Sequence, residues 1–401
     1  MQQDRVIRIY STMLAFEQRI EQALRNRQQQ GLTRHLSVVQ TMQHAKLINA
    51  GQGYDHFASN DYLGLASDQS LIRAWQDGLQ QYGAGSGASP LVSGFSPAHQ
   101  RLETLLCEWL GYSRAVLFSS GFSANQALLF TLLEEGDLLL QDKLNHASLI
   151  EAGLLSAAQS RRFQHNNLAH LNQLLTTHSA NHKLVVTEGV FSMDGDLAPL
   201  ALMQQQLDRR AWLMVDDAHG IGVLGEHGRG SCAQAGIQPD ILVVTFGKAL
   251  GLSGAAILCN ETLGDYLTQF ARHHVYSTAM PPALAHAVCH SVKMVQQQAW
   301  RREKLQELSA VYDRKLADVT GFVATATPIK PWILGTNQRA IAIADRLRER
   351  GIWVSAIRSP TVPVSKARLR ITLTSNHSTQ QVAHLADELL MALDRQGYGE
   401  C

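Results

Sequence analysis

Short apolar runs alternate with helical patterns through the central part of the chain. Six apolar runs are typical of buried strands: RAVLF, DLLLQ, KLVVTE, AWLMVD, DILVVTF and AAILC. Stretches with apolar residues at helical spacing separate several of them. This alternation predicts an α/β fold with a mostly parallel sheet and helices on both faces. In such a fold, ligands bind at the carboxyl ends of the strands.

The two ends of the chain follow other patterns. Residues 14–30 have helical spacing and a polar face, and short strand-like pieces follow at 46–57. After PPALAHAV, a long polar pattern (VKMVQQQAWRREKLQELSAVYDRKLADV) predicts one helix, and mixed helices and strands follow it. We therefore expect an N-terminal arm at 1–60, a large cofactor-binding domain at 61–295 and a small α+β domain at 296–401.

Composition narrows the function classes. The chain has 401 residues, of which only 17% are charged, and its formal net charge is +1, so no strong field favours nucleic acid. We find no window of about 18 apolar residues that would predict a membrane span. The five cysteines show neither CxxC pairing nor metal-ligand spacing, which is typical of a reducing compartment. These features predict a cytoplasmic protein without a metal site that acts on a small molecule.

The candidate chemistry lies just after two of the predicted strands. VDDAHGIG contains Asp216 and His219, and TFGKALG contains Lys248. A carboxylate beside a pyridine nitrogen keeps the ring protonated, and a lysine amine holds an aldehyde as a Schiff base, so this trio suits a pyridoxal phosphate enzyme. Neighbouring residues on a strand point to opposite faces, so we expect only one of Asp216 and Asp217 to meet the ring. The DDAHG spacing favours Asp216 and makes two turn-forming acids the weaker interpretation.

Several other residues could contact such a cofactor. In RAVLFSSGFSANQALL a strand runs into a helix, so the backbone N–H groups of Gly121 and Phe122 suit a phosphate. Thr245 can add a hydroxyl, His146 can stack on a ring, and Ser192 can hydrogen-bond a cofactor oxygen. Each also has a plainer structural interpretation. Gly121 and Phe122 would form an ordinary strand-to-helix turn, and Thr245 would be a β-forming residue at the end of a strand. His146 would lie beside a helix cap, and Ser192 would be a turn residue.

Taken in order, the motifs of the chain resemble those of the α-oxoamine synthases over nearly its whole length. The resemblance rests on NDYLGL, GSGASPLVSG, SSGFSANQALL, TEGVFSMDGDLAPL, VDDAHGIGVLG, TFGKALGLSGAA and YSTAMPP. It implies fold type I of the pyridoxal phosphate enzymes and a homodimer with active sites at the subunit interface. Within the family, AIRSPTVP and ARLRITLT look most like the biotin-pathway members. Those enzymes join L-alanine to a pimeloyl thioester of coenzyme A or acyl carrier protein and release carbon dioxide.

The resemblance also implies a role for individual residues. Lys248 would form the Schiff base, Asp216 would pair with the pyridine nitrogen, and His219 with the phenolic oxygen. Gly121, Phe122 and Thr245 would bind the phosphate, His146 would stack on the ring, and Ser192 would make a further contact with the cofactor. Thr278 would reach the phosphate of the other subunit's cofactor. The implied substrate contacts are Arg34, Asn60, His146, Arg358 and Thr361. A guanidinium suits a substrate carboxylate, and we take Arg358 as first choice and Arg370 as second.

One departure and three alternatives stay open. Ala88, Ser89 and Pro90 stand where many relatives carry a Gly-Ser-basic sequence, which leaves the contacts of this loop undefined. Glycine-using relatives such as glycine C-acetyltransferase accept other acyl thioesters and share every cofactor residue. An aminotransferase would use the same fold without a thioester. A regulator would keep the fold without turnover, although the joint presence of lysine, acid and histidine argues against it.

Overall fold

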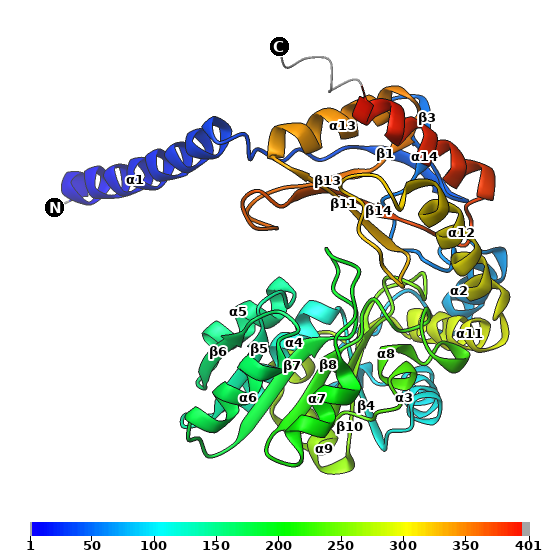
Figure 1. Cartoon of the computed structure of the whole chain (residues 1–401). Coiled ribbons are helices and arrows are strands. Elements are labelled where there is room, and N and C mark those ends of the chain that lie inside the picture. Colours follow the sequence, from blue (N-terminus) through cyan, green and yellow to red (C-terminus); the bar gives the residue numbers. More distant parts are fainter. Residues whose placement is uncertain (1, 395–401) are drawn as a thin grey trace.

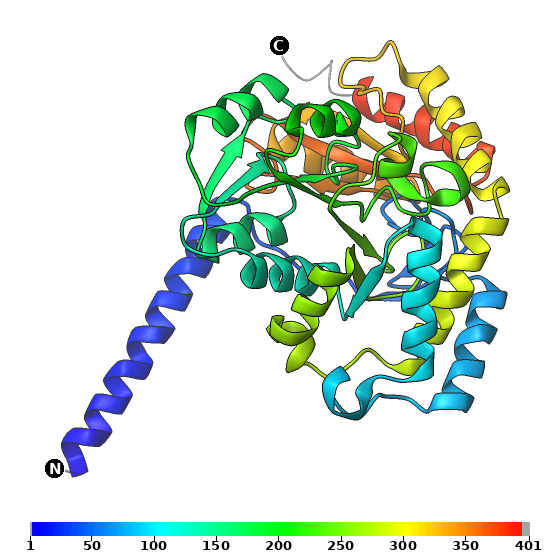
Figure 2. The ribbon, with the colours of Figure 1, turned by 90° about the horizontal axis from the view of Figure 1, so that it is seen from below.

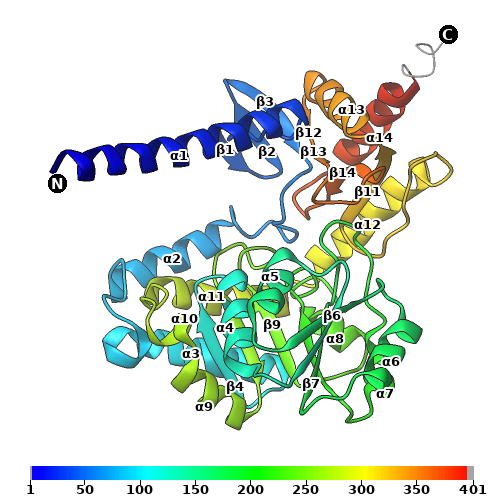
Figure 3. The ribbon, with the colours of Figure 1, turned by 90° about the vertical axis from the view of Figure 1, so that its left-hand side faces the viewer.

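Two bodies and one projecting helix make up the molecule (Figure 1). The computed structural model describes residues 2–394, and the side chains of residues 16–40 and 44–394. A large body surrounds one wide sheet, and a smaller body contains two further sheets. Helix α1 (Gln2–Gln29) extends away from both bodies, as the views from two other sides also show (Figures 2 and 3).

The large body is organised around a seven-stranded sheet of order β4-β10-β9-β8-β7-β5-β6. Strand β10 runs antiparallel to both neighbours, and the pairs from β9 to β6 are parallel. The prediction of a mostly parallel sheet is therefore confirmed. The strands are β4 (Arg114–Phe118), β5 (Leu138–Asp142), β6 (Gln159–Phe163), β7 (Lys183–Glu188), β8 (Trp212–Asp216), β9 (Ile241–Thr245) and β10 (Ala255–Cys259).

Helices cover both faces of this sheet, which explains why its central strands are apolar on both sides. Along β8, Leu213 and Val215 belong to one hydrophobic cluster, and Met214 belongs to the other. One face carries α4 (Gly121–Leu132), α5 (Ala147–Leu155) and α9 (Glu261–Phe270). The other carries α3 (Pro97–Leu110), α6 (Leu168–Thr177), α7 (Leu200–Leu207) and α11 (Pro282–Gln297). The remaining helices here are α2 (Gln69–Tyr82), η1 (Pro90–Gly94), η2 (Glu226–Gly228), α8 (Gly230–Gln234) and α10 (Arg272–Val275).

The smaller body joins strands from both ends of the chain. Strand β3 pairs in parallel with β12, with Asp55 opposite Ile352, so the predicted arm at 1–60 contributes strands to a sheet shared with the C-terminal segment. One sheet contains β1 (Val39–Gln43), β2 (Lys46–Asn49), β3 (Gln52–His56) and β12 (Ile352–Trp353); the other contains β11 (Ile329–Gly335), β14 (Ala367–Thr372) and β13 (Ser355–Ile357). Its helices are α12 (Trp300–Leu316), α13 (Asn337–Glu349) and α14 (Thr379–Asp394).

The long helix predicted after PPALAHAV is in fact two helices. Helix α11 ends at Gln297 and α12 begins at Trp300. Gln298 has φ −103° and ψ 63°, which is not helical. Just after the break, the buried Arg301 donates to the Leu63 carbonyl at 2.7 Å and to Asp68 at 2.6 Å. The prediction was wrong because these distant partners of a buried cation leave no mark in the helical pattern.

Candidate active site

A cavity of about 330 Å³ lies where β7, β8 and β9 end, against the first turn of α4. This is the edge of the sheet at which the sequence predicts a ligand. Eight predicted residues line it: Asn60, Gly121, Phe122, His146, Asp216, His219, Thr245 and Lys248. Six other predicted residues do not: Arg34, Ser192, Thr278, Arg358, Thr361 and Arg370.

Asp216 and Asp217 are adjacent but hold different positions. Asp216 lines the cavity, and its carboxylate accepts hydrogen bonds from Asn125 Nδ2 at 2.8 Å and from the Ala218 N–H at 3.0 Å. Asp217 is fully buried and accepts from the hydroxyl and the backbone N–H of Ser231, at 2.6 Å and 2.8 Å. Burial raises the pKa of Asp217 to about 7. Only Asp216 can therefore meet a ligand in the cavity.

Lys248 lies three residues beyond the end of β9 and lines the same cavity. Burial lowers the pKa of its amine, while the nearby carboxylates of Asp216 and Glu188 act in the opposite direction. A lowered pKa raises the fraction of free amine at neutral pH, which is the form that attacks an aldehyde or accepts a proton. The chain thus brings a nucleophilic amine and a carboxylate to one cavity.

His219 contacts a tyrosine, Tyr62, that no sequence pattern singled out. Its Nδ1 lies 2.7 Å from the hydroxyl of Tyr62, and both side chains are buried. Burial, and then the charges of Lys248 and Arg370, lower the pKa of His219 well below its usual range. The ring is therefore neutral at neutral pH. Tyr62 belongs to the NDYLGL motif, but 157 positions separate it from His219, so no local pattern could indicate the pairing.

Arg370 contacts a residue that lines the cavity, whereas Arg358 contacts Gly31 outside it. Arg370 Nε donates to the Ser192 carbonyl at 2.6 Å, and its Nη2 donates to Asn60 Oδ1 at 3.0 Å. Asn60 lines the cavity. Arg358 instead donates from Nη1 to the carbonyl of Gly31 at 3.0 Å. The structure therefore favours the second choice for the carboxylate-binding arginine over the first.

The first turn of α4 presents free donors to the cavity. Ser120 caps the helix and accepts from the Ser123 N–H at 3.1 Å. Within residues 2–394, the N–H groups of Gly121 and Phe122 have no hydrogen-bond partner, and neither does the buried hydroxyl of Thr245. A Cβ on Gly121 would come within 2.6 Å of Thr245 Cγ2, so these two residues adjoin. Such a group of donors at a helix N-terminus suits a phosphate.

Comparison with known proteins gives the family. The model of the class I and II aminotransferases matches residues 56–389. The chain is 62% identical over 382 residues to the 8-amino-7-oxononanoate synthase of Vibrio cholerae, an alignment that covers 95% of this chain and 99% of that protein. The chain belongs to the α-oxoamine synthase family.

Solved structures agree with this α-oxoamine synthase in fold. An 8-amino-7-oxononanoate synthase from Francisella tularensis is 33% identical, with a TM-score of 0.73 over 85% of this chain and 98% of that one. A serine palmitoyltransferase described with pyridoxal phosphate as its internal aldimine is 26% identical, with a TM-score of 0.89 over 95% and 98%. The predicted fold type I of the pyridoxal phosphate enzymes is confirmed.

The cavity of the synthase fits pyridoxal phosphate. The free donors at α4 suit the phosphate, and Asp216 and Lys248 supply the carboxylate and the amine that the ring and the aldehyde require. Three buried polar atoms of lining residues also have no partner within residues 2–394: Asn125 Oδ1, Glu188 Oε1 and Thr245 Oγ1. Buried polar atoms without partners are costly, so a polar ligand there offsets a real penalty.

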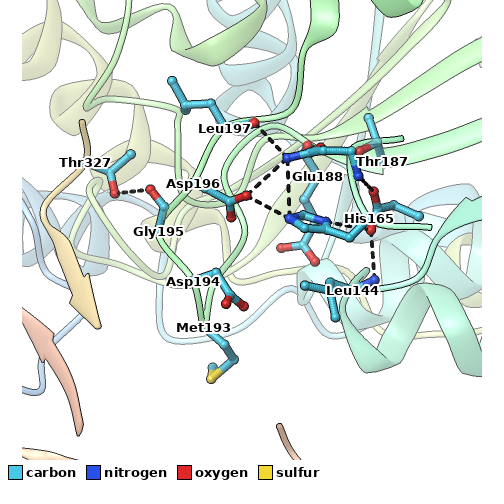
Figure 4. A network of polar contacts seen from close by, with 12 residues as sticks. Leu144, His165, Thr187, Glu188, Met193, Asp194, Gly195, Asp196, Leu197 and Thr327 are labelled. Carbon is cyan, nitrogen blue, oxygen red and sulfur yellow. Dashed lines mark hydrogen bonds and ion pairs between the residues drawn. The ribbon is translucent and has the colours of Figure 1, made fainter. Parts of the chain in front are cut away.

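The loop after β7, residues 189–197, is held by both bodies of the synthase (Figure 4). From the large body, His165 contacts Asp142 at 3.0 Å and Asp196 at 2.7 Å. From the smaller body, Thr327 donates to the Gly195 carbonyl at 2.7 Å. Burial alone would lower the pKa of His165, but its hydrogen bonds to the two carboxylates raise it to about 10. A cationic histidine therefore fixes the loop that carries Ser192.

Thr278 lies in a separate pocket beside Ser119. The segment around it is tied to the loop that departs from the family pattern. The Ala279 N–H donates to the carbonyl of Ala88 at 3.0 Å, and Ser86 Oγ donates to the Ala279 carbonyl at 2.7 Å. Pro90 then begins the short helix η1. The loop that contains Ala88, Ser89 and Pro90 thus helps to hold the segment around Thr278 in place.

Nine further residues line the cavity without having been predicted, and six of them are polar: Ser119, Ser120, Asn125, Ser148, Glu188 and Ser253. The motif SSGFSANQALL contains three of them, and the motif was recognised for its helix N-terminus only. Glu188 ends β7 opposite Asp216, and this register was the one available signal, because parallel strands align their last residues. Asn125 and Ser148 lie in helices, where a polar residue carries no local sign of what it faces.

The other sequence expectations concern cysteines and membrane spans. Cys107, Cys232, Cys259 and Cys289 are free thiols, and Cys401 lies outside the described residues. Among the helices of residues 2–394, none combines the length and the apolar character needed to cross a bilayer. No group of three metal-ligating side chains occurs in the part of the chain that the structure describes.

Proposed function

We propose that this chain catalyses the decarboxylative condensation of L-alanine with a pimeloyl thioester, as an 8-amino-7-oxononanoate synthase of biotin biosynthesis. The supporting observation is that Lys248, Asp216 and His219 line one cavity in a chain 62% identical to a relative of that name. Coenzyme A or acyl carrier protein would carry the pimeloyl group. The enzyme would be cytoplasmic, with no nucleic acid or membrane partner.

Pyridoxal phosphate, when bound, supplies an electron sink for the pair left at the α-carbon of the amino acid. Lys248 would bind its aldehyde, Asp216 its ring nitrogen and His219 its phenolic oxygen. The phosphate would lie at Gly121, Phe122 and Thr245, with Ser192 as a further contact and His146 over the ring. Each of these residues except Ser192 lines the cavity.

Lys248 also has the position and the chemistry of the general base. Its buried amine, with a lowered pKa, can accept the Cα proton of alanine and return a proton to the same carbon after carbon dioxide has left. Asp216 would place its carboxylate beside the ring nitrogen, and Asn125 and the Ala218 N–H fix the orientation of that carboxylate.

The substrate carboxylate requires a cation at the cavity wall. We propose Arg370 in this role, together with Asn60, because Arg370 is held in place by Asn60 and the Ser192 carbonyl. His146 lines the cavity and completes the inner substrate contacts. Arg34 and Thr361 are exposed, and Arg358 is only partly buried. These three would contact the acyl carrier or the distal part of the pimeloyl chain.

A homodimer would complete the site. Thr278 does not line the cavity of its own chain, which supports its predicted contact with the phosphate bound by the second copy. The loop at 88–90 would then act at the subunit interface, because it holds the Thr278 segment.

Thiol release tests the proposal directly. The purified protein is incubated with alanine or glycine and a panel of acyl thioesters, and free thiol and carbon dioxide are measured. Alanine with pimeloyl thioesters should be the preferred pair, and Lys248→Ala should abolish turnover without unfolding the chain. Preference for glycine with a short acyl group would favour glycine C-acetyltransferase. Amino-group transfer without thiol release would indicate an aminotransferase, and no turnover a binding protein.

Borohydride reduction supplies an independent check. The holoenzyme should lose its yellow colour and carry the reduced cofactor on the peptide that contains Lys248. Lys183, which donates to the Leu175 carbonyl far from the cavity lining, provides the control position. Label on another lysine would refute the assignment.

A further inference from the structure

A continuous path of hydrogen bonds joins Asp216 to His146. Asn125 Nδ2 donates to Asp216 Oδ2 at 2.8 Å and lies 2.9 Å from Ser148 Oγ. Ser148 Oγ in turn lies 2.8 Å from His146 Nδ1. Asn125 and Ser148 are 1% and 0% exposed, so water does not compete for these contacts. Both also line the cavity.

The donors in this path can be assigned without knowing any hydrogen position. The Ser148 backbone N–H lies 3.2 Å from His146 Nδ1, and a backbone N–H can only donate, so Nδ1 is an acceptor. The Ser148 hydroxyl must then also donate to Nδ1, and its oxygen accepts from Asn125. The second Nδ2 hydrogen of Asn125 goes to Asp216. The carboxylate fixes the amide, because the flipped amide would bring two acceptors together.

We propose that Asn125 and Ser148 are positioning residues that, together with the Ser148 backbone N–H, orient the His146 imidazole with its proton on Nε2. His146 then presents an N–H donor to a substrate oxygen in the cavity, and the carboxylate of Asp216 directs this donor through two intermediaries. The inference deepens the proposed function, on which it rests for the identity of the substrate.

Two features support this assignment over simple core packing. Burial lowers the pKa of His146, so the ring is neutral and its tautomer has to be chosen by its neighbours. A second contact holds the same ring, because the Ser148 backbone N–H also lies 3.2 Å from Nδ1. The ring is thus held at Nδ1 by both the backbone and the side chain of Ser148.

Ser231 offers a matched control. It is also a buried serine whose hydroxyl donates to a strand-end carboxylate, Asp217, at 2.6 Å. Its contact has no continuation to His146. Ser148→Ala and Ser231→Ala therefore remove equivalent hydrogen bonds, and only Ser148→Ala interrupts the path. Asn125→Ala interrupts it at a second point, which keeps the proposal testable if one variant folds poorly.

The first measurement uses the protein without added cofactor. In samples labelled with ¹⁵N-histidine, the His146 signals are assigned by their loss in His146→Asn. The parent should show an acceptor Nδ1 and a protonated Nε2. The backbone N–H at position 148 still donates to Nδ1 in both variants, so the proton should stay on Nε2. Loss of the hydroxyl contact should nevertheless move the Nδ1 signal of Ser148→Ala and Asn125→Ala toward that of a free acceptor, whereas Ser231→Ala should match the parent. An unchanged Nδ1 signal in both Ser148→Ala and Asn125→Ala would overturn the proposal.

The second measurement uses the holoenzyme. Ser148→Ala and Asn125→Ala should each lower kcat/KM for thiol release about tenfold, as expected for the loss of one hydrogen bond. Asn125→Ala also frees the Asp216 carboxylate, so it should lose at least as much activity as Ser148→Ala, and the double variant should be no less active than Asn125→Ala. Additive losses would contradict the path. If the parent releases no thiol from any thioester while the Nδ1 result holds, the proposed function fails and the positioning path stands.

Discussion

Nε2 of His165 lies 2.7 Å from Oδ2 of Asp196, and this contact attaches the loop that carries Ser192 to the large body of the synthase. The opposite ring nitrogen lies 3.0 Å from Asp142, a fully buried carboxylate at the end of β5. The histidine therefore bridges two acids and stays protonated over a wide range of pH.

The stability of the protein should depend on this proton. The folded-state pKa of His165 is about 10, above its unfolded value near 6.5. Its contribution is therefore fully present below pH 6.5 and is lost as the pH rises through 10. The contribution is on the order of 2 kcal/mol after screening is allowed for, because Asp196 is 39% exposed. His165→Asn should remove most of it, and urea unfolding at pH 6, 8 and 10 measures the slope.

His182 is the control for that experiment. It contacts Asp137 at the same distance of 3.0 Å, but its side chain is 87% exposed. His182→Asn should therefore leave the stability between pH 6 and 10 within about 0.5 kcal/mol of the parent. A full slope retained in His165→Asn would contradict the bridging role.

The two adjacent acids should differ sharply when each is replaced by asparagine. Asp216→Asn should weaken cofactor binding and lower kcat by about a thousandfold or more, because it removes the charge opposite the protonated ring. Asp217→Asn should bind cofactor normally and lose about 1–2 kcal/mol of stability, because one hydrogen bond from Ser231 is lost. Cofactor titration and chemical unfolding of both variants separate the two effects. Equal cofactor affinities would refute the electron-sink role of Asp216.

Arg370 and Arg358 make a second informative pair. Lysine at 370 cannot reproduce the fork that contacts the Ser192 carbonyl and Asn60, so Arg370→Lys should raise the KM for alanine about tenfold or more. Arg358→Lys should leave that KM close to the parent value, because its one contact is the Gly31 carbonyl. Steady-state kinetics with varied alanine distinguishes them. The reverse result would restore Arg358 as the carboxylate ligand.

Tyr62 should matter through His219. Tyr62→Phe removes the hydroxyl 2.7 Å from Nδ1 and should lower kcat/KM about tenfold while shifting the absorption maximum of the bound cofactor. Burial raises the pKa of this hydroxyl to about 12, so it acts as a neutral donor at every working pH. The matched change is Tyr312→Phe, since the buried Tyr312 hydroxyl has no partner in residues 2–394. Tyr312→Phe should leave the absorption maximum of the bound cofactor unchanged. A shift of equal size in both variants would contradict the role of Tyr62.

The sequence predicted the parts of the site that local motifs encode. Asp216, His219 and Lys248 each follow an apolar strand within a few residues, and the carboxyl ends of parallel strands meet at one edge of the sheet. Gly121 and Phe122 could be predicted for a similar reason, because they lie between a strand and a helix that the local pattern indicates. Their assembly in one cavity follows from the alternation of elements, and the family resemblance adds the chemistry of the cofactor.

The rest depends on contacts between distant segments. Tyr62 and His219 meet across the chain, and Asn125 meets both Asp216 and Ser148 from the interior of a helix. Strand β6 was not predicted, because QSRRF is a polar edge strand with little of the apolar pattern of its neighbours. The division of the chain at residues 60 and 295 stays a prediction, as do the roles of the individual site residues.

Gly195 lies between the part of the β7 loop that contacts the smaller body and the part that contacts the large body. The carbonyls of residues 192 and 193 accept hydrogen bonds from Arg370 and Arg368 of β14. Asp196 instead contacts His165 of the large body. Gly195 has φ +68°, and a Cβ there would come within 2.5 Å of the Ile329 carbonyl, so no side chain fits. A relative motion of the two bodies would therefore strain the short segment between these contacts, in which Gly195 lies. Ser192 would then move together with Arg370 and the smaller body.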